Sequence, residues 1–514
     1  MSPGTQRILY PVHRWGGVVL CLVLTMWFAT GILLMYVGFP KLTQVERLSQ
    51  FEDLTASACC IPLDKVLAKQ SFEASPQTIE AVIVGGRPIY KFGFDTSYRR
   101  ADARTGEPLP DVSKQEALQV ASHVMRGATG RYDGLVDEDI WTHTQRFAKH
   151  RPYHRIEMDD PATTLLYISS RTGEVLRDAP LSERRWAYAG AWLHWLYMFR
   201  TQKSSDPVWQ WAVSISCMVG IILVGTGTWI GISRWRFSGR YNSGRKTPYP
   251  KPLWRWHHIG GLLFAFITLT WLISGLASVN PLGIFDRQAI ADRGAYRGDA
   301  LAPDNFSLSP SAAIARLAPS FAPRQLEWAS IGGDPYLIAT DAKNAVRVLP
   351  GADASGDFRS GVSEASVRRG SAMLIPGAKV EKFEILTHYD GQYYTRAEHT
   401  LRGDENRRLP VYRVTYSDPT RSIVYIDTNT GEIVMHLDRP ERAYRWAFNL
   451  LHSWDWNPLV TTRPLWDIIM LTLMAGGLVI CVSGTILGWR RLKFAASNRR
   501  KKKMAARMKS EKTA

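Results

Sequence analysis

Four histidines beside apolar segments are the residues of this sequence best placed to do chemistry. His13 begins the run H-R-W-G-G, and His257 stands in W-R-W-H-H-I-G-G, each just before a long apolar segment. His194 in W-L-H-W-L-Y and His452 in L-L-H-S-W-D-W stand ahead of two further apolar segments. Ionisable groups are rare at membrane helices and are usually functional there. Two neutral imidazoles that face each other suit the axial positions of a b-type haem.

Four apolar segments must position these histidines. They cover Trp15–Phe39, Val208–Ile232, Trp254–Val279 and Leu465–Trp489, and each is long enough to cross a bilayer. Trp and Tyr crowd their ends, as in the aromatic belts of membrane helices. The first segment is too long for a signal peptide and is interpreted as a retained anchor. The mean hydropathy of −0.16 indicates that large polar segments lie between the helices.

Positive charge predicts the orientation of the helices. The link 233–255 carries seven basic residues and no acidic one, and the segment from Arg490 carries eleven basic residues and one Glu. Because basic residues mark the cytoplasmic side, both termini and this link are expected inside and the two polar lobes outside. The net charge of +18 is therefore explained by membrane topology, and a nucleic-acid partner is not expected.

These signals predict eight successive regions. They are the cytoplasmic N-terminus with the first membrane helix (1–39), a first lobe with an interfacial helix (40–207), a second membrane helix (208–232), a basic cytoplasmic link (233–253), a third membrane helix (254–279), a second lobe with an interfacial helix (280–464), a fourth membrane helix (465–489) and a basic cytoplasmic tail (490–514).

Constant shifts in residue number indicate that the chain is an internal repeat. A shift of 244 takes His13, Trp27 and Gly31 to His257, Trp271 and Gly275. A shift of 258 takes His194 and T-G-E at 172–174 to His452 and T-G-E at 430–432. Two copies of helix–lobe–helix that both start inside are parallel repeats about an axis along the membrane normal. We therefore expect two pairs: an inner pair, His13 with His257, and an outer pair, His194 with His452.

Each histidine pair is expected to hold one b-type haem, which gives two haems per chain. Glycines beside the inner pair and along the second and fourth helices would let a macrocycle approach; they are Gly16, Gly17, Gly220, Gly225, Gly227, Gly260, Gly261, Gly476, Gly477 and Gly484. His258 remains a second ligand candidate or an interface residue. In the ordinary alternative, the histidines bond to lipid headgroups and the glycines only allow helix packing. A nicotinamide or flavin motif is absent, so the electrons must come from a separate donor, either a cytoplasmic reductase or a membrane quinol.

The two lobes have the alternating patterns of small α+β units. Ile79–Val84 and Ile89–Phe94 predict a strand pair around a Gly-Gly turn, and Glu327–Ile331 with Tyr336–Thr340 repeats it. Apolar stretches near 63–67 and 312–317 predict a helix before each hairpin. The predicted fold is a four-helix transmembrane bundle made of two parallel helix–lobe–helix repeats, with two α+β lobes.

In these motifs the sequence resembles the PepSY-associated transmembrane family. The T-G-E turns look like PepSY lobes, while H-R-W-G-G, W-H-H-I-G-G and the two L-H motifs look like the family's helix-end motifs. The resemblance implies a bacterial inner-membrane, multi-pass haem protein with periplasmic lobes that reduces ferric siderophores or another ferric chelate in iron uptake. It also implies axial ligation by His13, His257, His194 and His452.

Two lobe segments offer candidates for contact with a ferric chelate. The segment 141–154 supplies His143, His150, Arg151 and His154, and the segment 387–399 supplies Tyr389. The alternative is that these residues belong to an ordinary solvated surface. A metal cluster built from the three histidines lacks a diagnostic spacing.

Two further functions compete with a reductase. PepSY lobes also occur as regulators of periplasmic proteases, which would make the chain a non-enzymatic membrane protein indifferent to the four histidines. A permease is disfavoured because the helices hold few polar residues. Cys59 and Cys60 are adjacent in a lobe, where a vicinal disulfide, bonding to a partner or no special role are all open.

Overall fold

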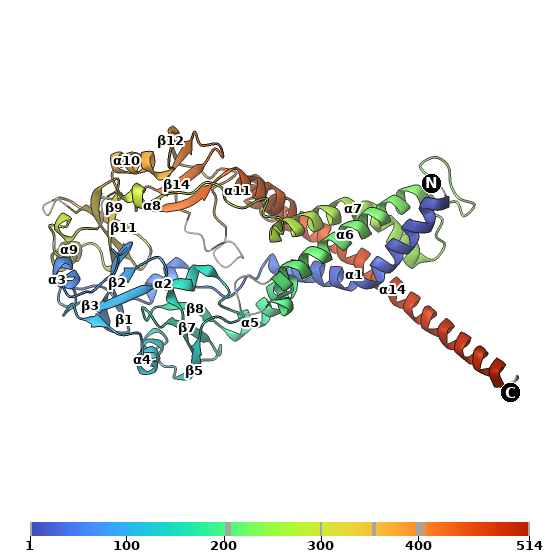
Figure 1. Cartoon of the computed structure of the whole chain (residues 1–514), viewed down its shortest axis with the longest axis horizontal. Coiled ribbons are helices and arrows are strands. Elements are labelled where there is room, and N and C mark those ends of the chain that lie inside the picture. Colours follow the sequence, from blue (N-terminus) through green and yellow to red (C-terminus); the bar gives the residue numbers. More distant parts are fainter. Residues whose placement is uncertain are drawn as a thin grey trace.

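The structure is a bundle of long helices joined at one end to two lobes (Figure 1). It is a computed structural model that describes residues 3–200, 207–298, 301–351, 356–396, 403 and 407–511. The chain's N-terminal end lies at the end of the bundle remote from the lobes, and α14 extends beyond the bundle toward the C-terminus (Figure 1).

The four helices of the bundle are α1 (Pro3–Leu34), α6 (Pro207–Arg234), α7 (Pro252–Val279) and α14 (Leu465–Glu511). The prediction of four membrane-length helices is confirmed, because each contains a long apolar span with few charges. α1 and α7 each pack against both α6 and α14, which places α1 and α7 on one diagonal of the bundle.

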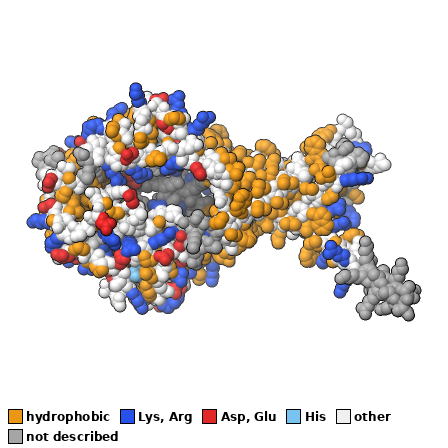
Figure 2. All heavy atoms as spheres, viewed as in Figure 1, with side chains coloured by type: hydrophobic (Ala, Val, Ile, Leu, Met, Phe, Trp, Pro, Cys, Tyr) orange, Lys and Arg blue, Asp and Glu red, His pale blue; other side chains and the backbone are white. Residues whose placement is uncertain are grey.

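Apolar side chains cover the outside of the bundle. Val19, Leu263 and Phe266 are 72%, 71% and 77% exposed, and the hydrophobic surface over the helices contrasts with the mixed charge of the lobes (Figure 2). Burying such side chains in water-excluding surroundings is strongly favourable. The chain is therefore a multi-pass membrane protein with this surface in contact with lipid.

Two helices differ from their predicted bounds. α1 begins at Pro3 instead of Trp15 and ends at Leu34, so His13 lies inside the helix and not at its start. Proline is favoured in a first helical turn because its missing N–H has no partner to lose there. α14 continues past Trp489 to Glu511, since the segment from 490 is rich in Ala, Lys, Arg and Met and has no Gly or Pro to stop a helix.

The part of the lobes remote from the bundle is one antiparallel sheet of seven strands, in the order β11-β10-β9-β1-β2-β3-β4. The first lobe supplies β1 (Thr78–Val84), β2 (Arg87–Gly93), β3 (Tyr98–Asp102) and β4 (Pro108–Leu109); the second supplies β9 (Pro323–Ile331), β10 (Asp334–Asp341) and β11 (Val346–Pro350). The helices α3 (Leu63–Leu67) and α9 (Pro310–Leu317) contribute to the core against it.

The joining of the two lobes through β1 and β9 was not predicted. Ile79 stands opposite Trp328, and Ala81 opposite Leu326; all four side chains are buried in one continuous core. The pairing gives each edge strand a partner, which removes two rows of unpaired backbone groups that would otherwise be open to aggregation. The alternating pattern shows that a strand exists but does not show which strand lies beside it.

Nearer the bundle, each lobe has its own four-stranded antiparallel sheet. The first contains β5 (Gly130–Val136), β6 (Tyr153–Met158), β7 (Leu165–Ser169) and β8 (Val175–Ala179), with α4 (Lys114–Val124) packed on it; the second contains β12 (Val380–Leu386), β13 (Val411–Tyr416), β14 (Ile423–Asp427) and β15 (Ile433–Leu437), with α10 (Glu364–Leu374). The lobes are α+β, as predicted. In each T-G-E turn the glycine has positive φ, +80° at Gly173 and +70° at Gly431, a conformation that favours glycine.

Short helices connect each lobe to the bundle. In the first lobe these are α5 (Leu181–Ala187), the π-helical turn η2 (Tyr188–Trp192) and η3 (Tyr197–Phe199); in the second they are α11 (Arg439–Tyr444), the π-helical turn η5 (Arg445–Leu450), α12 (Leu451–Ser453) and α13 (Asn457–Val460). Elsewhere lie α2 (Gln44–Ser49), η1 (Gln145–His150), α8 (Arg293–Arg297) and η4 (Pro303–Asn305). Both connections reverse the chain at a left-handed residue, Leu196 or Trp454.

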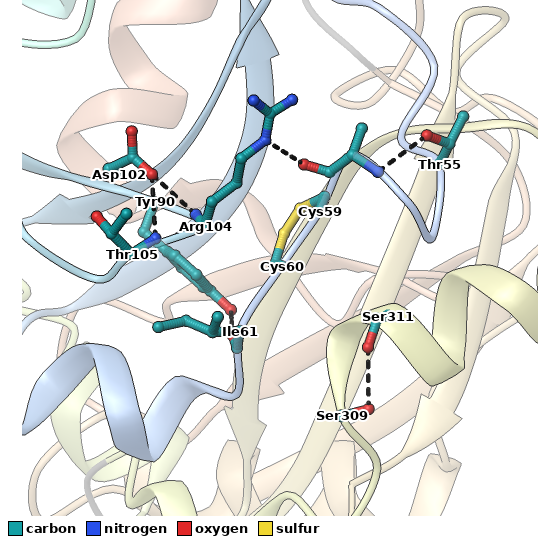
Figure 3. Close-up of a disulfide and its surroundings, with 11 residues drawn as sticks. Thr55, Cys59, Cys60, Ile61, Tyr90, Asp102, Arg104, Thr105, Ser309 and Ser311 are labelled. Atoms are coloured by element: carbon teal, nitrogen blue, oxygen red, sulfur yellow. Dashed lines mark hydrogen bonds between the residues drawn. A yellow bond between two sulfur atoms is a disulfide. The ribbon is translucent and has the colours of Figure 1, made fainter.

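Cys59 and Cys60 form a vicinal disulfide in the first lobe (Figure 3). Both residues are buried in the same core as Tyr90, whose hydroxyl donates to the carbonyl oxygen of Ile61 at 2.8 Å. Arg104 donates to the carbonyl oxygen of Ala58 at 3.1 Å on the other side. The disulfide thus lies in a packed region far from the bundle. The other cysteines, Cys21, Cys217 and Cys481, are buried free thiols.

Candidate functional site

The inner pair lies in the core of the bundle, with one histidine on each of the two diagonally opposed helices. His13 is on α1 and His257 is on α7. Their ring centres lie 6.4 Å apart, with an angle of 44° between the ring planes. Phe28 and Trp271 meet across the same diagonal, with ring centres 5.3 Å apart.

The outer pair lies at the lobe end of the bundle. His194 is the second residue after the end of η2, and His452 belongs to α12, which directly follows η5. Their ring centres are 6.1 Å apart, with an angle of 79° between the ring planes. π-helical turns are frequent at functional sites, and here each one leads into a histidine. Thr30, which contacts His194, follows His13 by 17 residues on α1, which corresponds to about 25 Å along a helix.

All four histidines are oriented through the same ring nitrogen, Nδ1. His13 Nδ1 donates to the carbonyl oxygen of Leu223 at 3.0 Å. The other three contacts, to hydroxyl oxygens, are His257 with Ser483 at 2.8 Å, His194 with Thr30 at 3.0 Å and His452 with Ser274 at 2.9 Å. Such contacts fix the tautomer and direction of a ligating imidazole, because the bonded nitrogen keeps the proton and the opposite one keeps its lone pair.

The hydroxyls that contact the histidines are themselves committed as donors. Thr30 donates to the carbonyl oxygen of Met26 at 2.8 Å, Ser274 to that of Trp271 at 3.0 Å and Ser483 to that of Ile480 at 2.7 Å. Each hydroxyl has one proton, so it can only accept from the histidine. The Nδ1 atoms therefore carry the protons, and the Nε2 atoms carry the lone pairs that a metal needs.

The spacing of each pair fits two axial ligands of one metal. Two metal–imidazole bonds of about 2 Å, with roughly 1 Å from each bonding nitrogen to its ring centre, place ring centres about 6 Å apart. The observed separations are 6.4 Å and 6.1 Å. Within the described residues, no group of three or more His, Cys, Asp or Glu side chains could hold an ion. Two imidazoles alone suit a metal whose remaining positions are filled by a macrocycle.

Glycines give the histidines the room that this geometry requires. A Cβ added at Gly227 would collide with the ring of His13, and one at Gly484 would lie 3.4 Å from the ring of His257. A Cβ at Gly31 would lie 3.5 Å from the ring of His194. Around Gly261, an added Cβ would meet no atom within 4 Å. The residues present therefore fit a flat group held between the helices.

Burial keeps His194, one of the two histidines outside the membrane spans, neutral. Removal from water lowers the pKa of His194 to about 4, so its imidazole is unprotonated at neutral pH. A neutral imidazole is the form that binds metals.

The structure distinguishes His257 from its neighbour. His258 contacts Thr247 Oγ1 through Nδ1 at 2.8 Å and the carbonyl oxygen of Gly231 through Nε2 at 2.8 Å. Both of its nitrogens are thus engaged by protein groups, and it ties the link after α6 to the start of α7. His257 is the residue that faces His13.

The histidines proposed for contact with a chelate are not gathered into one open site. His143 and Arg151 both contact Glu138, at 2.8 Å and 2.7 Å. His150 is buried against Tyr98 with ring centres 4.5 Å apart. His154 is buried between the Tyr132 hydroxyl and the Val112 carbonyl oxygen.

Burial also disfavours the charged form of these histidines. It lowers the pKa of His150 to about 4 and lowers the pKa values of His143 and His154. Each of them contacts a group of the first lobe itself through a ring nitrogen. Tyr389 lies in the second lobe, where its hydroxyl donates to the carbonyl oxygen of Arg407 at 2.9 Å. Residues 397–399 of the second candidate segment lie outside the described part of the chain.

Sequence reasoning missed the side chains that orient the histidines. Thr30 and Ser274 are related by the same shift of 244 as His13 and His257, so this signal was present in the sequence. Two hydroxyl residues at matched positions in apolar helices are inconspicuous, however, because such residues also bond to their own helix backbone.

Fold and site together define a membrane protein with two pairs of facing histidines below α+β lobes. The chain belongs to the family described as the PepSY-associated TM region, whose model matches residues 10–327, more than half of its length. No curated protein is significantly similar to it.

Proposed function

We propose that the chain is a transmembrane reductase with two b-type haems, one at the inner pair and one at the outer pair. It takes electrons from a cytoplasmic reductase or a membrane quinol and delivers them to a ferric siderophore or another ferric chelate during iron uptake. The observation that carries this proposal is the facing of two histidine pairs whose Nδ1 atoms are all occupied and whose spacings match axial ligation.

Haem supplies one-electron chemistry, because its bound iron alternates between the ferric and ferrous states. The chain's own residues supply the remainder of the site. His13 and His257 would hold one haem, and His194 and His452 the other, through their imidazole nitrogens. Leu223, Thr30, Ser274 and Ser483 hold those imidazoles in one tautomer and direction. The apolar core of the bundle, with Leu20, Phe28 and Leu272, excludes water between the pairs.

The proposed setting is the bacterial inner membrane, with both termini in the cytoplasm and the lobes in the periplasm. The basic link and basic C-terminal segment support this orientation. We further infer that the chain is a duplicated helix–lobe–helix unit. Thr30 and Ser274, which contact His194 and His452, support the duplication because they are separated by the same shift as His13 and His257.

The test is the visible spectrum of the purified protein, reduced with dithionite minus oxidised by air, with haem measured per chain. Wild type should contain two b-type haems, and His452→Ala and His13→Ala should each lose one. His123→Ala, a first-lobe histidine paired with Glu52, is the matched control and should retain both. Reduction of a ferric chelate should be lost in the two ligand variants.

Full haem content in His452→Ala would contradict the assignment of the outer pair. A single haem in wild type would contradict transfer across the whole bundle. A colourless protein from cells that supply haem would reject the reductase and favour a non-enzymatic regulator of periplasmic proteases.

A further inference from the structure

The link between α6 and α7 contains a small hairpin, residues 236–246, at the end of the bundle remote from the lobes (Figure 1). The backbone N–H of Arg236 donates to the carbonyl oxygen of Lys246 at 3.0 Å, which closes the hairpin. The Tyr241 hydroxyl donates to the carbonyl oxygen of Arg234, the last residue of α6, at 2.9 Å. This segment, called the basic hairpin below, is therefore attached to the end of the bundle.

The basic hairpin carries positive charge without a balancing acid. Its basic residues are Arg236, Arg240, Arg245 and Lys246, and all four are exposed. The whole link 233–255 contains no Asp or Glu. In the described part of the chain, none of these four residues takes part in an ion pair. Their charge is therefore available to an anion from outside the chain.

Hydrogen bonds hold two of the guanidinium groups in place before any ligand arrives. Arg236 donates to the carbonyl oxygen of Arg240 at 2.7 Å, and Arg240 donates to that of Gly244 at 2.9 Å. The Arg236 guanidinium also lies over the ring of Tyr241, 4.2 Å from its centre. Each of these hydrogen bonds uses one of the five N–H groups of a guanidinium. The remaining N–H groups suit phosphate oxygens, which arginine binds through two parallel hydrogen bonds.

Exposed aromatic side chains accompany this charge. Phe237, within the basic hairpin, is 70% exposed, and Trp229 on α6 and Trp254 on α7 are exposed as well. Lys and Arg side chains border the hydrophobic surface at this end of the bundle (Figure 2). Tryptophans concentrate at the level of lipid headgroups, and Trp229 precedes Arg236 by seven residues, about 10 Å along a helix. The basic hairpin therefore begins close to the headgroup level.

The basic segment at the end of α14 is placed differently. α14 continues as one helix past Trp489, and its extension leaves the bundle (Figure 1). Arg499 follows Trp489 by ten residues, which is about 15 Å along a helix. The extension thus leads away from the exposed tryptophans, whereas the basic hairpin stays beside them. Of the two basic segments, the hairpin is the better placed to contact lipid headgroups.

We propose that the basic hairpin is a binding site for the headgroup of an anionic phospholipid such as phosphatidylglycerol. Its arginines contact the phosphate, and Phe237 lies against the lipid. The aromatic side chains at the same level favour a lipid over a soluble acidic protein. Thr247, directly after the hairpin, contacts His258, the neighbour of His257, at 2.8 Å, so the bound lipid braces a helix that carries an inner-pair histidine. The site does not depend on haem or on the reductase.

The test titrates the purified full-length protein, in an uncharged detergent, with dioleoyl phosphatidylglycerol and counts lipid-bound chains by native mass spectrometry. Wild type should bind it at least about tenfold more tightly than zwitterionic dioleoyl phosphatidylcholine. Arg236→Gln and Arg240→Gln should each weaken binding about fivefold, the factor for one basic residue at an anionic surface. Arg499→Gln in the extension of α14 and Arg368→Gln in α10, where Arg368 is paired with Glu364, are the matched controls and should bind as wild type does.

Arg236→Lys and Arg240→Lys keep the charge and should retain most of the affinity, which separates loss of charge from a misfolded hairpin. Equal binding by wild type and both Gln variants, or equal losses in the Lys and Gln variants, would overturn the proposal. Equal binding of the two lipids would also overturn it and leave the basic hairpin to a soluble acidic partner. Displacement of the lipid by soluble glycerol phosphate at the same concentration would do so too, because the site would then serve a free phosphate ester. Arginine-dependent binding of phosphatidylglycerol by a colourless protein would uphold the site and reject the reductase.

Discussion

Glu174 in the first lobe and Glu432 in the second stand at the same place in their T-G-E turns, yet their surroundings differ. Glu174 accepts from Lys91 at 2.9 Å and from Arg47 at 3.1 Å. Burial alone would raise the pKa of Glu174, but these two cations lower it to about 2. Glu432 has an exposed side chain at the edge of the packed region, where partial loss of hydration and the neighbouring Asp427 raise its pKa.

The sheet register explains the difference. In the first lobe, Glu80 on β1 stands opposite Lys91 on β2. In the second lobe, the matching residue Glu327 on β9 stands opposite Ile338 on β10. Glu327 also faces Glu80 across the β1–β9 junction, and burial together with Glu80 and Glu432 raises its pKa to about 8.

The comparison shows that corresponding strands of the two lobes can have different arrangements of charge. In the first lobe, the buried cations and carboxylates are ion-paired with one another. The second leaves carboxyls at the lobe junction without an equivalent lysine. Matching topology therefore does not imply matching chemistry, and each lobe needs its own variants.

The largest effect is expected from Lys91→Met. Lys91 is 3% exposed and ion-pairs with both Glu80 and Glu174, so its removal leaves two carboxylates in the protein interior. Breaking a buried pair costs about 3–5 kcal/mol. The apparent melting temperature of the detergent-solubilised protein should fall sharply. Lys69→Met removes the exposed pair with Glu107 and should change stability by less than about 1 kcal/mol; equal losses in both variants would contradict the buried network.

The pH dependence of stability should depend on Glu327. A carboxyl with a raised pKa in the folded chain takes up a proton on folding, so its contribution to stability is lost as pH rises from 4.5 to about 8. The loss is at most about 1.4 kcal/mol per pH unit. Glu327→Gln should therefore match wild type near pH 5 and exceed its stability increasingly toward pH 8.

Melting of both proteins across this pH range measures the difference. Glu107→Gln, which changes an exposed carboxyl of the first lobe, serves as the control. It should not change how steeply stability varies with pH. If Glu327→Gln and wild type kept a constant difference between pH 5 and 8, the junction would not hold a protonated carboxyl.

The smallest effect concerns two matched tryptophans in the bundle. The indole N–H of Trp27 donates to the carbonyl oxygen of His194 at 2.8 Å, whereas that of Trp271 is buried without a hydrogen-bond partner. Trp27→Phe should lower stability by about 1 kcal/mol more than Trp271→Phe. Thermal unfolding of the two variants tests this. A greater loss of stability in Trp271→Phe would contradict the conclusion that only the Trp27 indole is hydrogen-bonded.

Much of the scaffold could be predicted from the sequence because apolar length and alternation are local signals. The four membrane helices and the α+β lobes followed from them. The pairing of His13 with His257 and of His194 with His452 was also predictable, since shifts of 244 and 258 relate residues far apart in the chain. The structure brings both predicted pairs together, with ring centres 6.4 Å and 6.1 Å apart.

What the sequence did not predict depends on contacts between distant segments. Nothing in Ile79–Val84 indicates that its edge meets β9, because any exposed strand edge can accept a partner. The candidates at 141–154 were selected for residue type, but the structure buries His150 and His154.

The pairing of β1 with β9 also sets the order in which the molecule can be completed during biosynthesis. Synthesis proceeds from the N-terminus, so β1 emerges long before α6, α7 and β9. Until β9 arrives, the apolar strand Thr78–Val84 carries an unpaired edge, the kind of surface that promotes aggregation of incomplete chains. A nascent chain halted at α7 would therefore hold a first lobe in need of protection by chaperones, and the maturation of both lobes would end in one late step.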